Sequence, residues 1–350
     1  MILFFGPYPT PENERDGMIQ RVAAVDQLVA DRPRHYIFAS YRKHIRRSTE
    51  QRGLATIHRV NFFLHWFFIL KWILSAERIY VHSAFNVIFA LPAYLIGKCV
   101  ITDVHGVVPE ETRTENKQLK ACVMSIAERV AVYRSAMLVC VTRRMAEHLR
   151  HKYPKSAESI VLPVFDQGLL ESRYEREPSG DALSVIYAGG LQIWQNIELM
   201  LEFTKTHPHY NYLFLTPSPD TLRRRAELQG ATSTNLTFSS CPHDQIAPYY
   251  AKADLGFLLR DNNIINNVAC PTKAIEYMAH GIVPIVLNTH IGDFGALGAR
   301  FLLLNEMDQP PTAEEILVMR KANFACLDHL IETFRRGSST LVRLLVSAQV

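Results

Sequence analysis

The 350-residue sequence lacks the short motifs that mark several common enzyme classes. It has no Gly-x-Gly-x-x-Gly after a strand, no Walker loop, no Gly-x-Ser-x-Gly, no His-Glu-x-x-His and no Asp-x-Asp pair. These absences argue against a nicotinamide-dependent enzyme, a kinase-like protein and a metalloprotease. Internal repeats and low-complexity tracts are absent too, and 48% hydrophobic residues with ordinary Gly and Pro content describe a soluble globular protein.

The six cysteines form no Cys-x-x-Cys pair and no spacing with histidine that would build a zinc site. We expect reduced thiols in a cytoplasmic protein. The first residues, "MILFFGPYP", lack the basic segment and long apolar core of a signal peptide, and they predict a first buried strand.

Charge is unevenly distributed along the chain. Residues 1–178 carry a net charge of +7 and residues 179–350 carry −3. The basic first half favours an anionic partner, such as membrane headgroups, lipid phosphates or nucleic acid, or it only keeps the surface soluble.

The apolar run Val60–Leu74 is too short to cross a bilayer, because 15 helical residues span about 22 Å against a hydrocarbon core of about 30 Å. Two interpretations stay open. The run is a core-facing helix of the first domain, or its aromatic face lies in a membrane interface beside nearby basic residues. Those residues are Arg42, Lys43, Arg46, Arg47, Arg52 and Arg59.

Short β-branched or aromatic runs alternate with helical patterns throughout, which predicts an α/β protein with two doubly wound, Rossmann-like domains facing a cleft. In the first half we expect strands at Ile2–Phe5, His35–Ala39, Ala55–Arg59, Arg78–His82, Val100–Asp103 and Met137–Val141, and helices at Met18–Ala30 and Leu119–Val132. In the second half we expect strands at Ser184–Ala188, Tyr212–Thr216, Leu236–Phe238, Leu255–Leu259 and Val283–Leu287. Its expected helices are Ile197–His207, Pro219–Gln229, Pro242–Ala251, Pro271–His280, a capped helix from Thr312 to about His329, and Ser339–Val350.

The predicted domains are residues 1–170 and 180–335, joined by a polar linker. Residues 336–350 would form a C-terminal helix that packs back on the first domain.

The stretch "CPTKAIEYMAHGIVPIVL", Cys270–Leu287, predicts a helix that starts at Pro271 and runs into a buried strand. A helix N-terminus attracts phosphate, and Lys273 in the first turn adds positive charge. Arg260, at the end of the preceding strand, could add a bidentate contact. Glu276 could accept hydrogen bonds from two sugar hydroxyls. Alternatively, Lys273 and Glu276 form an ordinary surface ion pair.

Four stretches together resemble GT-B glycosyltransferases of the family-4 kind. They are "TDVHGVVPEE", "VIYAGGLQIWQNIELMLEF", "YYAKADLGFLLR" and "EYMAHGIVPIV", and the resemblance extends from about Arg78 to Asp293. It implies retaining transfer of a sugar from a nucleotide diphosphosugar without a metal ion or other cofactor. The nucleotide would bind the C-terminal domain and the acceptor the N-terminal one.

The resemblance also implies roles for individual residues. Glu276 would hold the ribose, Thr272 and Lys273 would contact the diphosphate, and His105 would lie near the transferred sugar. The catalytic candidates are therefore His105, Lys273 and Glu276. The expected donor-binding set is Gly17, Gly189, Gly190, Arg260, Asn266, Asn267, Thr272, Lys273 and Glu276.

Three positions depart from the family pattern. Gly190 and Gln195 stand where an Arg and a Lys are common, and Val268 stands where a first Glu is common. Either Arg260 and Lys273 replace the missing cations, with Asn266 and Asn267 in place of the carboxylate, or the site is impaired.

The expected partners are a nucleotide-sugar donor and a glycan or polyprenyl-linked acceptor, with peripheral membrane association at the inner face of the cytoplasmic membrane and no nucleic acid. A non-catalytic GT-B relative and a sugar-nucleotide epimerase or hydrolase are the rival hypotheses. Three smaller alternatives stay open. Trp194 could stack on a ligand or pack against the protein, and His82 with Ser83 could line the cleft or lie in the core. Asp103 could orient His105 or end a strand.

Overall fold

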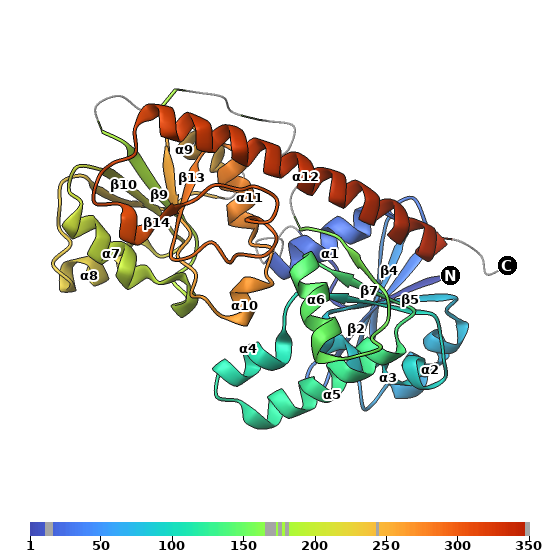
Figure 1. Ribbon diagram of the computed structural model, residues 1–350. Coiled ribbons are helices and arrows are strands. Elements are labelled where there is room, and N and C mark those ends of the chain that lie inside the picture. Colours follow the sequence, from blue (N-terminus) through green and yellow to red (C-terminus); the bar gives the residue numbers. More distant parts are fainter. Residues whose placement is uncertain (11–16, 165–172, 174–176, 179–181, 243–244, 347–350) are drawn as a thin grey trace. The chain divides into compact units, whose positions relative to one another are not determined.

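The computed structural model describes residues 1–350 except 11–16, 165–172, 174–176, 179–181, 243–244 and 347–350 (Figure 1). The chain divides into two compact units. Unit 1 comprises Met1–Phe165 with Glu332–Val350, and unit 2 comprises Asp166–Ile331. Each unit contains one mainly parallel sheet covered by helices, so the expected α/β class is confirmed.

The sheet of unit 1 has the strand order β3-β4-β2-β1-β5-β6-β7-β8, and β3 alone pairs antiparallel, with β4. Its strands are β1 (Ile2–Phe5), β2 (Arg34–Ser40), β3 (Ser48–Arg52), β4 (Ala55–Asn61), β5 (Arg78–His82), β6 (Val100–Val104), β7 (Met137–Cys140) and β8 (Ser159–Val161). The six predicted strands are confirmed within two residues at each end. The sequence did not predict β3, because "STEQR" is a polar, mostly exposed edge strand without apolar alternation.

The helices of unit 1 are α1 (Gly17–Gln27), α2 (Trp66–Ser75), α3 (Ser83–Leu95), α4 (Val108–Thr114), α5 (Gln118–Arg134) and α6 (Arg143–Lys152). The apolar run Val60–Leu74 is not one helix, because Val60 and Asn61 end β4 and residues 62–65 form a turn. The run is helical only from Trp66 on, in α2, which buries Ile69 and Ile73 in the core. Among the described residues, no helix combines the length and apolar character that crossing a membrane would require.

The sheet of unit 2 is parallel, with the order β11-β10-β9-β12-β13-β14. Its strands are β9 (Ser184–Ala188), β10 (Asn211–Leu215), β11 (Leu236–Ser239), β12 (Leu255–Phe257), β13 (Val283–Val286) and β14 (Leu302–Leu303). Its helices are α7 (Ile197–Thr206), α8 (Pro219–Leu228), α9 (Ala247–Tyr250), α10 (Ile264–Asn267) and α11 (Thr272–Ala279). The predicted helix Pro242–Ala251 was too long, since only its last part is helical, and residues 243–244 lie outside the described residues.

The strand order reverses direction at one place in each sheet. In unit 1 the chain goes outward from β1 first toward β2 and then toward β5, and in unit 2 from β9 first toward β10 and then toward β12. Such a switch point leaves a crevice at the carboxyl ends of the two central strands, where ligands of doubly wound sheets bind.

The C-terminal helix α12 (Ala313–Val346) is one continuous helix of 34 residues, so the two separate helices predicted for this region were wrong. Its capping box is confirmed: Glu315 N donates to Thr312 Oγ1 at 3.2 Å, and Thr312 N donates to Glu315 Oε2 at 2.8 Å. Gly337 does not end the helix. A Cβ there would lie 2.3 Å from the Val161 carbonyl oxygen, so this glycine allows close packing within unit 1.

Candidate functional site

The switch point of unit 2 gathers the loops after β9 and β12 and the start of α11. Two contacts set α11 against this edge. Ala188 N, at the end of β9, donates to Tyr277 Oη at 3.2 Å. In β12, a Cβ at Gly256 would lie 2.5 Å from the Tyr277 ring, so only glycine admits that ring. The helix N-terminus is therefore held where a doubly wound sheet binds its ligand.

Lys273, on the first turn of α11, extends toward the loop after β9. Its Nζ lies 4.3 Å from the centre of the Tyr187 ring and donates to Gln195 Oε1 at 3.5 Å. A Cβ at Gly189 would lie 2.5 Å from the same Nζ. Gly189 is thus the residue that leaves room for the ammonium group, and the half-buried Lys273 is not a member of an ordinary surface ion pair.

Burial lowers the pKa of Lys273 to about 7, with Arg260 adding to the effect and Glu276 opposing it. The cause is the loss of water around the ammonium group, together with repulsion between two cations. An anion arriving between Lys273 and Arg260 would favour the protonated amine. The residues around Lys273 therefore supply less negative charge than its ammonium form needs.

Arg260 follows β12 and is held in place by its neighbours. Its carbonyl accepts from Asn288 Nδ2 at 2.9 Å, and its Nη1 donates to Asn266 Oδ1 at 3.4 Å. Within the part of the chain that the structure describes, Arg260 Nε is buried and has no hydrogen-bond partner. A buried donor without a partner is costly, so an anion at this position would be stabilised.

The Asn-rich loop after β12 holds itself together. Asn266 is 5% exposed, and its Nδ2 donates to Asp261 O at 2.9 Å while its backbone N donates to Asn263 Oδ1 at 3.0 Å. The structure therefore places Asn266 as a residue that shapes the loop and orients Arg260. Asn267 is half-buried on the same short helix α10, and its amide lies 2.9 Å from Asn262 Oδ1.

The loop after β9 is also ordered by its own side chains. A Cβ at Gly190 would lie 2.5 Å from Gln192 Oε1, so the Gln192 amide covers the position where the resemblance expects an arginine. Tyr187 Oη donates to Gly190 O at 2.5 Å. Farther along, Trp194 is 52% exposed, in the 3₁₀ turn Ile193–Gln195.

Asn196 connects this loop to the one after β12. Its backbone is left-handed, with φ +56°, and its Nδ2 donates to Leu259 O at 3.2 Å and to Asp261 Oδ1 at 3.0 Å. Asparagine tolerates this backbone conformation better than most residues. The two loops that flank the switch point are thereby fixed to each other.

Glu276 and Thr272 also belong to this edge. Glu276 is half-buried and its Oε2 accepts from Tyr250 Oη at 3.0 Å. Thr272 is the first residue of α11. Pro271, expected as the first helical residue, instead precedes the helix, because its ψ of 118° is extended. Val268, where the family pattern has a Glu, is 2% exposed.

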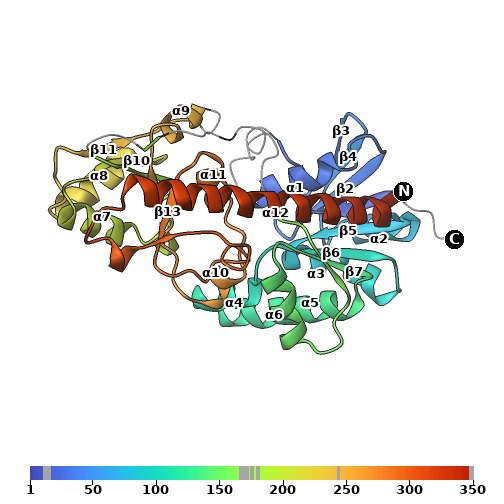
Figure 2. The ribbon, with the colours of Figure 1, turned by 45° about the horizontal axis from the view of Figure 1, so that its top comes forward.

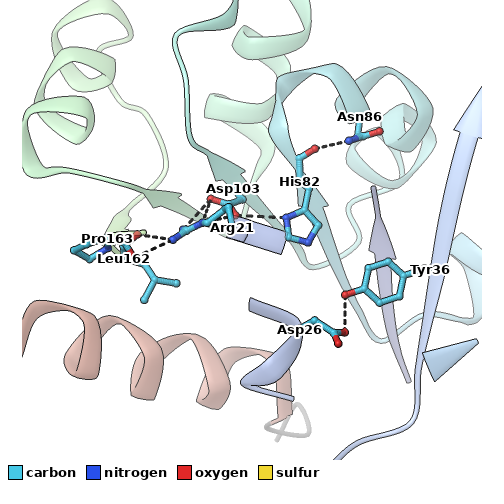
Figure 3. A network of polar contacts seen from close by, with 8 residues as sticks. All are labelled: Arg21, Asp26, Tyr36, His82, Asn86, Asp103, Leu162 and Pro163. Carbon is cyan, nitrogen blue, oxygen red and sulfur yellow. Dashed lines mark hydrogen bonds and ion pairs between the residues drawn. The ribbon is translucent and has the colours of Figure 1, made fainter. Parts of the chain in front are cut away.

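In unit 1 the carboxyl ends of β5 and β6 carry a buried charged network (Figure 3). Arg21 of α1 donates to Asp103 through Nε at 2.9 Å and through Nη2 at 3.0 Å, and its Nη1 donates to Leu162 O at 2.5 Å. Asp103 is fully buried inside β6, so the two roles considered for it, orienting His105 or ending a strand, miss its main partner, Arg21. Burial raises the pKa of Asp103, but Arg21 and the nearby His82 and His105 bring it well below its ordinary value.

His82 ends β5 and lies in this network, 1% exposed, with Nδ1 3.5 Å from Asp103 Oδ2. It is therefore a core histidine. Ser83 follows with a φ of +65°, which is strained for a non-glycine residue. His105 is half-buried in the loop after β6. Gly17 is the first residue of α1, and residues 11–16 before it lie outside the described residues.

Thus the structure brings Gly189, Gly190, Arg260, Lys273 and Glu276 to one sheet edge of unit 2, whereas His105 and Gly17 belong to unit 1. Sequence reasoning missed Tyr187, Tyr250 and Arg21. A signal existed for Arg21, which lies four residues before the apolar, buried Val25 on the predicted helix. Among the described residues, no cluster of three or more His, Cys, Asp or Glu could hold a metal ion.

The two doubly wound units define the GT-B fold. The chain is similar to sucrose-phosphate synthase from Thermosynechococcus elongatus, with 13% identity, a TM-score of 0.67, and 98% of this chain and 97% of that chain covered. It is also similar to HepE from Anabaena, solved in complex with UDP and glucose, with 12% identity, a TM-score of 0.66, and 97% and 98% covered. It is similar as well to the UDP-forming α,α-trehalose-phosphate synthase from Burkholderia vietnamiensis, with 10% identity, a TM-score of 0.61, and 98% of this chain and 99% of that chain covered.

No protein-family model matches the chain, and no curated protein matches it. The likeness to solved structures confirms the GT-B fold that the motifs indicated.

Proposed function

We propose that the protein is a glycosyltransferase that moves a hexosyl or N-acetylhexosaminyl group from a nucleoside diphosphosugar to an acceptor, with retention. The observation that carries the proposal is the site of Lys273. A lysine whose pKa is lowered to about 7 lies in a space kept open by Gly189, near Arg260, whose Nε has no partner among the described residues. Such a site is suited to a diphosphate.

The chemistry of the transfer fits these residues. When the bond between the sugar and the diphosphate breaks, negative charge grows on the leaving phosphate oxygen. Lys273 and Arg260 can stabilise that charge, as can the N–H groups at the start of α11. Glu276, which accepts a hydrogen bond from the Tyr250 hydroxyl, would accept hydrogen bonds from ribose hydroxyls. Neither a metal ion nor another cofactor is needed for this arrangement.

We propose that the acceptor is a glycan or a polyprenyl-linked saccharide and that the reaction serves surface polysaccharide or lipopolysaccharide synthesis. The protein would work in the cytoplasm, peripherally at the inner face of the membrane. The support is the net charge of +7 in residues 1–178 and the aromatic run that forms α2. His105 would lie beside the transferred sugar.

The first test is a thermal-shift panel of UDP-, GDP-, ADP-, dTDP- and CMP-sugars. A ligand at about 100 times its Kd stabilises a fold by about 2.7 kcal/mol, enough to move the melting temperature by several degrees. We expect a shift with one nucleotide class, loss of that shift in Lys273→Met, and a weaker shift in Glu276→Gln. Lys252→Met, at an exposed lysine of the same unit, is the matched control and should keep the full shift.

A non-catalytic relative that binds a nucleotide or a partner glycosyltransferase is the second candidate. Two observations favour it: Val268 is buried where the family has a Glu, and Gln192 covers Gly190 where it has an Arg. The two candidates differ in turnover. Release of nucleoside diphosphate that depends on an added glycan acceptor supports the transferase. Binding of the donor without release of nucleoside diphosphate, whichever acceptor is added, supports the second candidate.

A further inference from the structure

The helices α2, α3 and α5 lie side by side on one face of the sheet of unit 1 (Figures 1 and 2). Their inward residues join one core, to which α2 contributes Ile69 and Ile73, α3 contributes Val87 and Ala90, and α5 contributes Ala127. A helix that packs on a core in this way normally turns a polar stripe to the solvent. The solvent side of these three helices carries a few basic side chains among a larger number of apolar ones.

Instead, apolar side chains continue on their outward faces. The helix α3, "SAFNVIFALPAYL", contains no charged residue at all. We define the three-helix face as the exposed apolar residues on or directly beside these helices. They are Phe63, Leu64, Trp66, Phe67, Leu74, Phe85, Leu95, Ile96, Leu119, Val123, Ile126 and Tyr133.

On α5 the exposed apolar residues follow helical spacing. Leu119, Val123, Ile126 and Tyr133 lie at intervals of four, three and seven residues, so they form one outward stripe. A stripe of this kind needs a partner. Isolated exposed apolar residues are ordinary, but a dozen of them on or beside three adjacent helices indicate an interaction surface.

The charges on these helices indicate the kind of partner. Every exposed charged side chain of α2, α3 and α5 is basic: they are Lys71, Lys120, Arg129 and Arg134. The one acidic residue, Glu128, is 2% exposed and binds Lys152 at 2.5 Å. Two of the cations lie over aromatic rings of the same face, Lys120 over Phe85 at 4.8 Å and Arg129 over Tyr133 at 6.0 Å.

Acidic residues just outside the helices are neutralised by neighbours. Glu77 pairs with the chain N-terminus at 2.9 Å, and Glu115 pairs with Lys117 at 2.7 Å. The surface therefore combines aromatic and aliphatic side chains with positive charge only. That combination complements the interface of a bilayer that contains anionic lipids.

We infer that the three-helix face docks on an anionic lipid surface, with the apolar side chains in the interfacial region and the four cations among the headgroups. Its biological purpose, bringing the enzyme to a lipid-linked acceptor, rests on the proposed function. The surface itself does not involve Lys273 or Arg260. Docking and donor binding can therefore fail or succeed independently.

The test is co-sedimentation of the full chain with vesicles of phosphatidylcholine alone and with added phosphatidylglycerol. We expect binding that requires phosphatidylglycerol and weakens with salt. Phe67→Glu/Leu119→Glu should weaken it at least about tenfold, because each change removes a large apolar side chain from the interface and adds a negative charge. Leu228→Glu, at a leucine of unit 2 that is 89% exposed, is the matched control and should bind as the unchanged protein does.

Three results would overturn the inference: no sedimentation with either vesicle, equal loss in Leu228→Glu, or a dimer in analytical ultracentrifugation that the double change dissociates. The last would show that a second copy covers the face. Nucleotide-induced stabilisation, measured on the same proteins, separates the two hypotheses. It should survive Phe67→Glu/Leu119→Glu and be lost in Lys273→Met, which should still bind vesicles.

Discussion

The surroundings of Lys273 disfavour the charged form of its amine. Burial and the neighbouring Arg260 lower the pKa of this amine to about 7, against an ordinary value of 10.5. A residue that destabilises the empty fold and suits an anionic ligand is expected at a functional site. Gly189 also points to a functional site, since its lack of a side chain leaves the space that Lys273 Nζ occupies.

Replacing Lys273 by Met should therefore stabilise the ligand-free protein while abolishing nucleotide binding. The folded pKa lies below the unfolded one, so the unfolded state holds more protons between pH 7 and 10.5, and the stability of the unchanged protein rises with pH across that window. The advantage of Lys273→Met should be largest below pH 7 and shrink toward pH 10.5. Urea unfolding at several pH values measures it, and a variant less stable than the unchanged protein at pH 6 would contradict this account.

At this scale the sequence predicted Lys273, Glu276 and Arg260 because their place at a helix start and a strand end has a direct chemical meaning. It could not predict that Tyr187 lies under Lys273, because Tyr187 belongs to a strand 86 positions earlier and nothing local records the contact. The role predicted for Asn266 in donor binding missed its local contacts with Asp261 and Asn263. The structure shows it holding its own loop.

At the scale of elements, α1 is attached to the sheet of unit 1 by a buried ion pair. Arg21 and Asp103 are 1% and 0% exposed. Breaking such a pair by removing one partner leaves an uncompensated buried charge. Leu162 O would lose a donor as well.

We expect Arg21→Met to destabilise unit 1 by about 3–5 kcal/mol, because Asp103 would remain buried without its cation. The control is Arg223→Met, which breaks an exposed pair with Asp220 and should cost less than about 1 kcal/mol. Denaturant unfolding followed by circular dichroism measures both. Equal losses of unfolding free energy in the two variants would show that the buried ion pair stabilises the protein no more than the exposed one.

The sequence predicted strands better than helix ends. The buried strand β1, "ILFF", was predicted at its exact residues because a continuous apolar run of four residues has few other interpretations. Strand β5, "RIYVH", was predicted exactly because its centre is β-branched and aromatic. Helix α12 was wrongly predicted as two helices, Thr312 to about His329 and Ser339–Val350, and Gly337, a residue type that usually weakens a helix, lies in the gap between them. The contact with Val161, distant in sequence, overrides that preference.

At the scale of the whole molecule, α12 has residues in both units, with Ala313–Ile331 in unit 2 and Glu332–Val346 in unit 1. Its Gly337 packs against Val161 and Leu162 of unit 1. Glycine to alanine inside a helix normally stabilises it by about 0.5–1 kcal/mol. Here a Cβ would meet the Val161 carbonyl oxygen at 2.3 Å, and backbone cannot easily move away.

We therefore expect Gly337→Ala to destabilise unit 1 by about 1–3 kcal/mol, as overpacking does. Ser339→Ala, on the exposed side of the same helix, should instead be neutral or slightly stabilising. Calorimetric melting compares them. Because the nucleotide site belongs to unit 2, Gly337→Ala should keep nucleotide-induced stabilisation, and losing it would contradict the assignment of that site.

The fold class of the whole molecule could be predicted from the sequence because alternating strands and helices leave few architectures open. The order of the strands in each sheet could not be predicted, since the sequence pattern of a strand does not determine which strand it pairs with. The three-helix face was visible in the sequence only for α2. The outward stripe of α5 and the exposed Phe85 and Leu95 of α3 became apparent once the structure showed which side of each helix faces the core.

The measurement that tests the central claim most directly is the pH dependence of donor affinity. A nucleoside diphosphosugar suits it, because its diphosphate does not titrate between pH 6.5 and 8.5. If the ammonium form of Lys273 binds the diphosphate, the affinity of the unchanged protein should fall by about 20- to 30-fold across that range, since the free amine loses its proton near pH 7. Lys273→Met should bind weakly and equally at both pH values. An unchanged protein whose affinity does not vary with pH, or a variant that binds as tightly, would show that the diphosphate does not bind at Lys273.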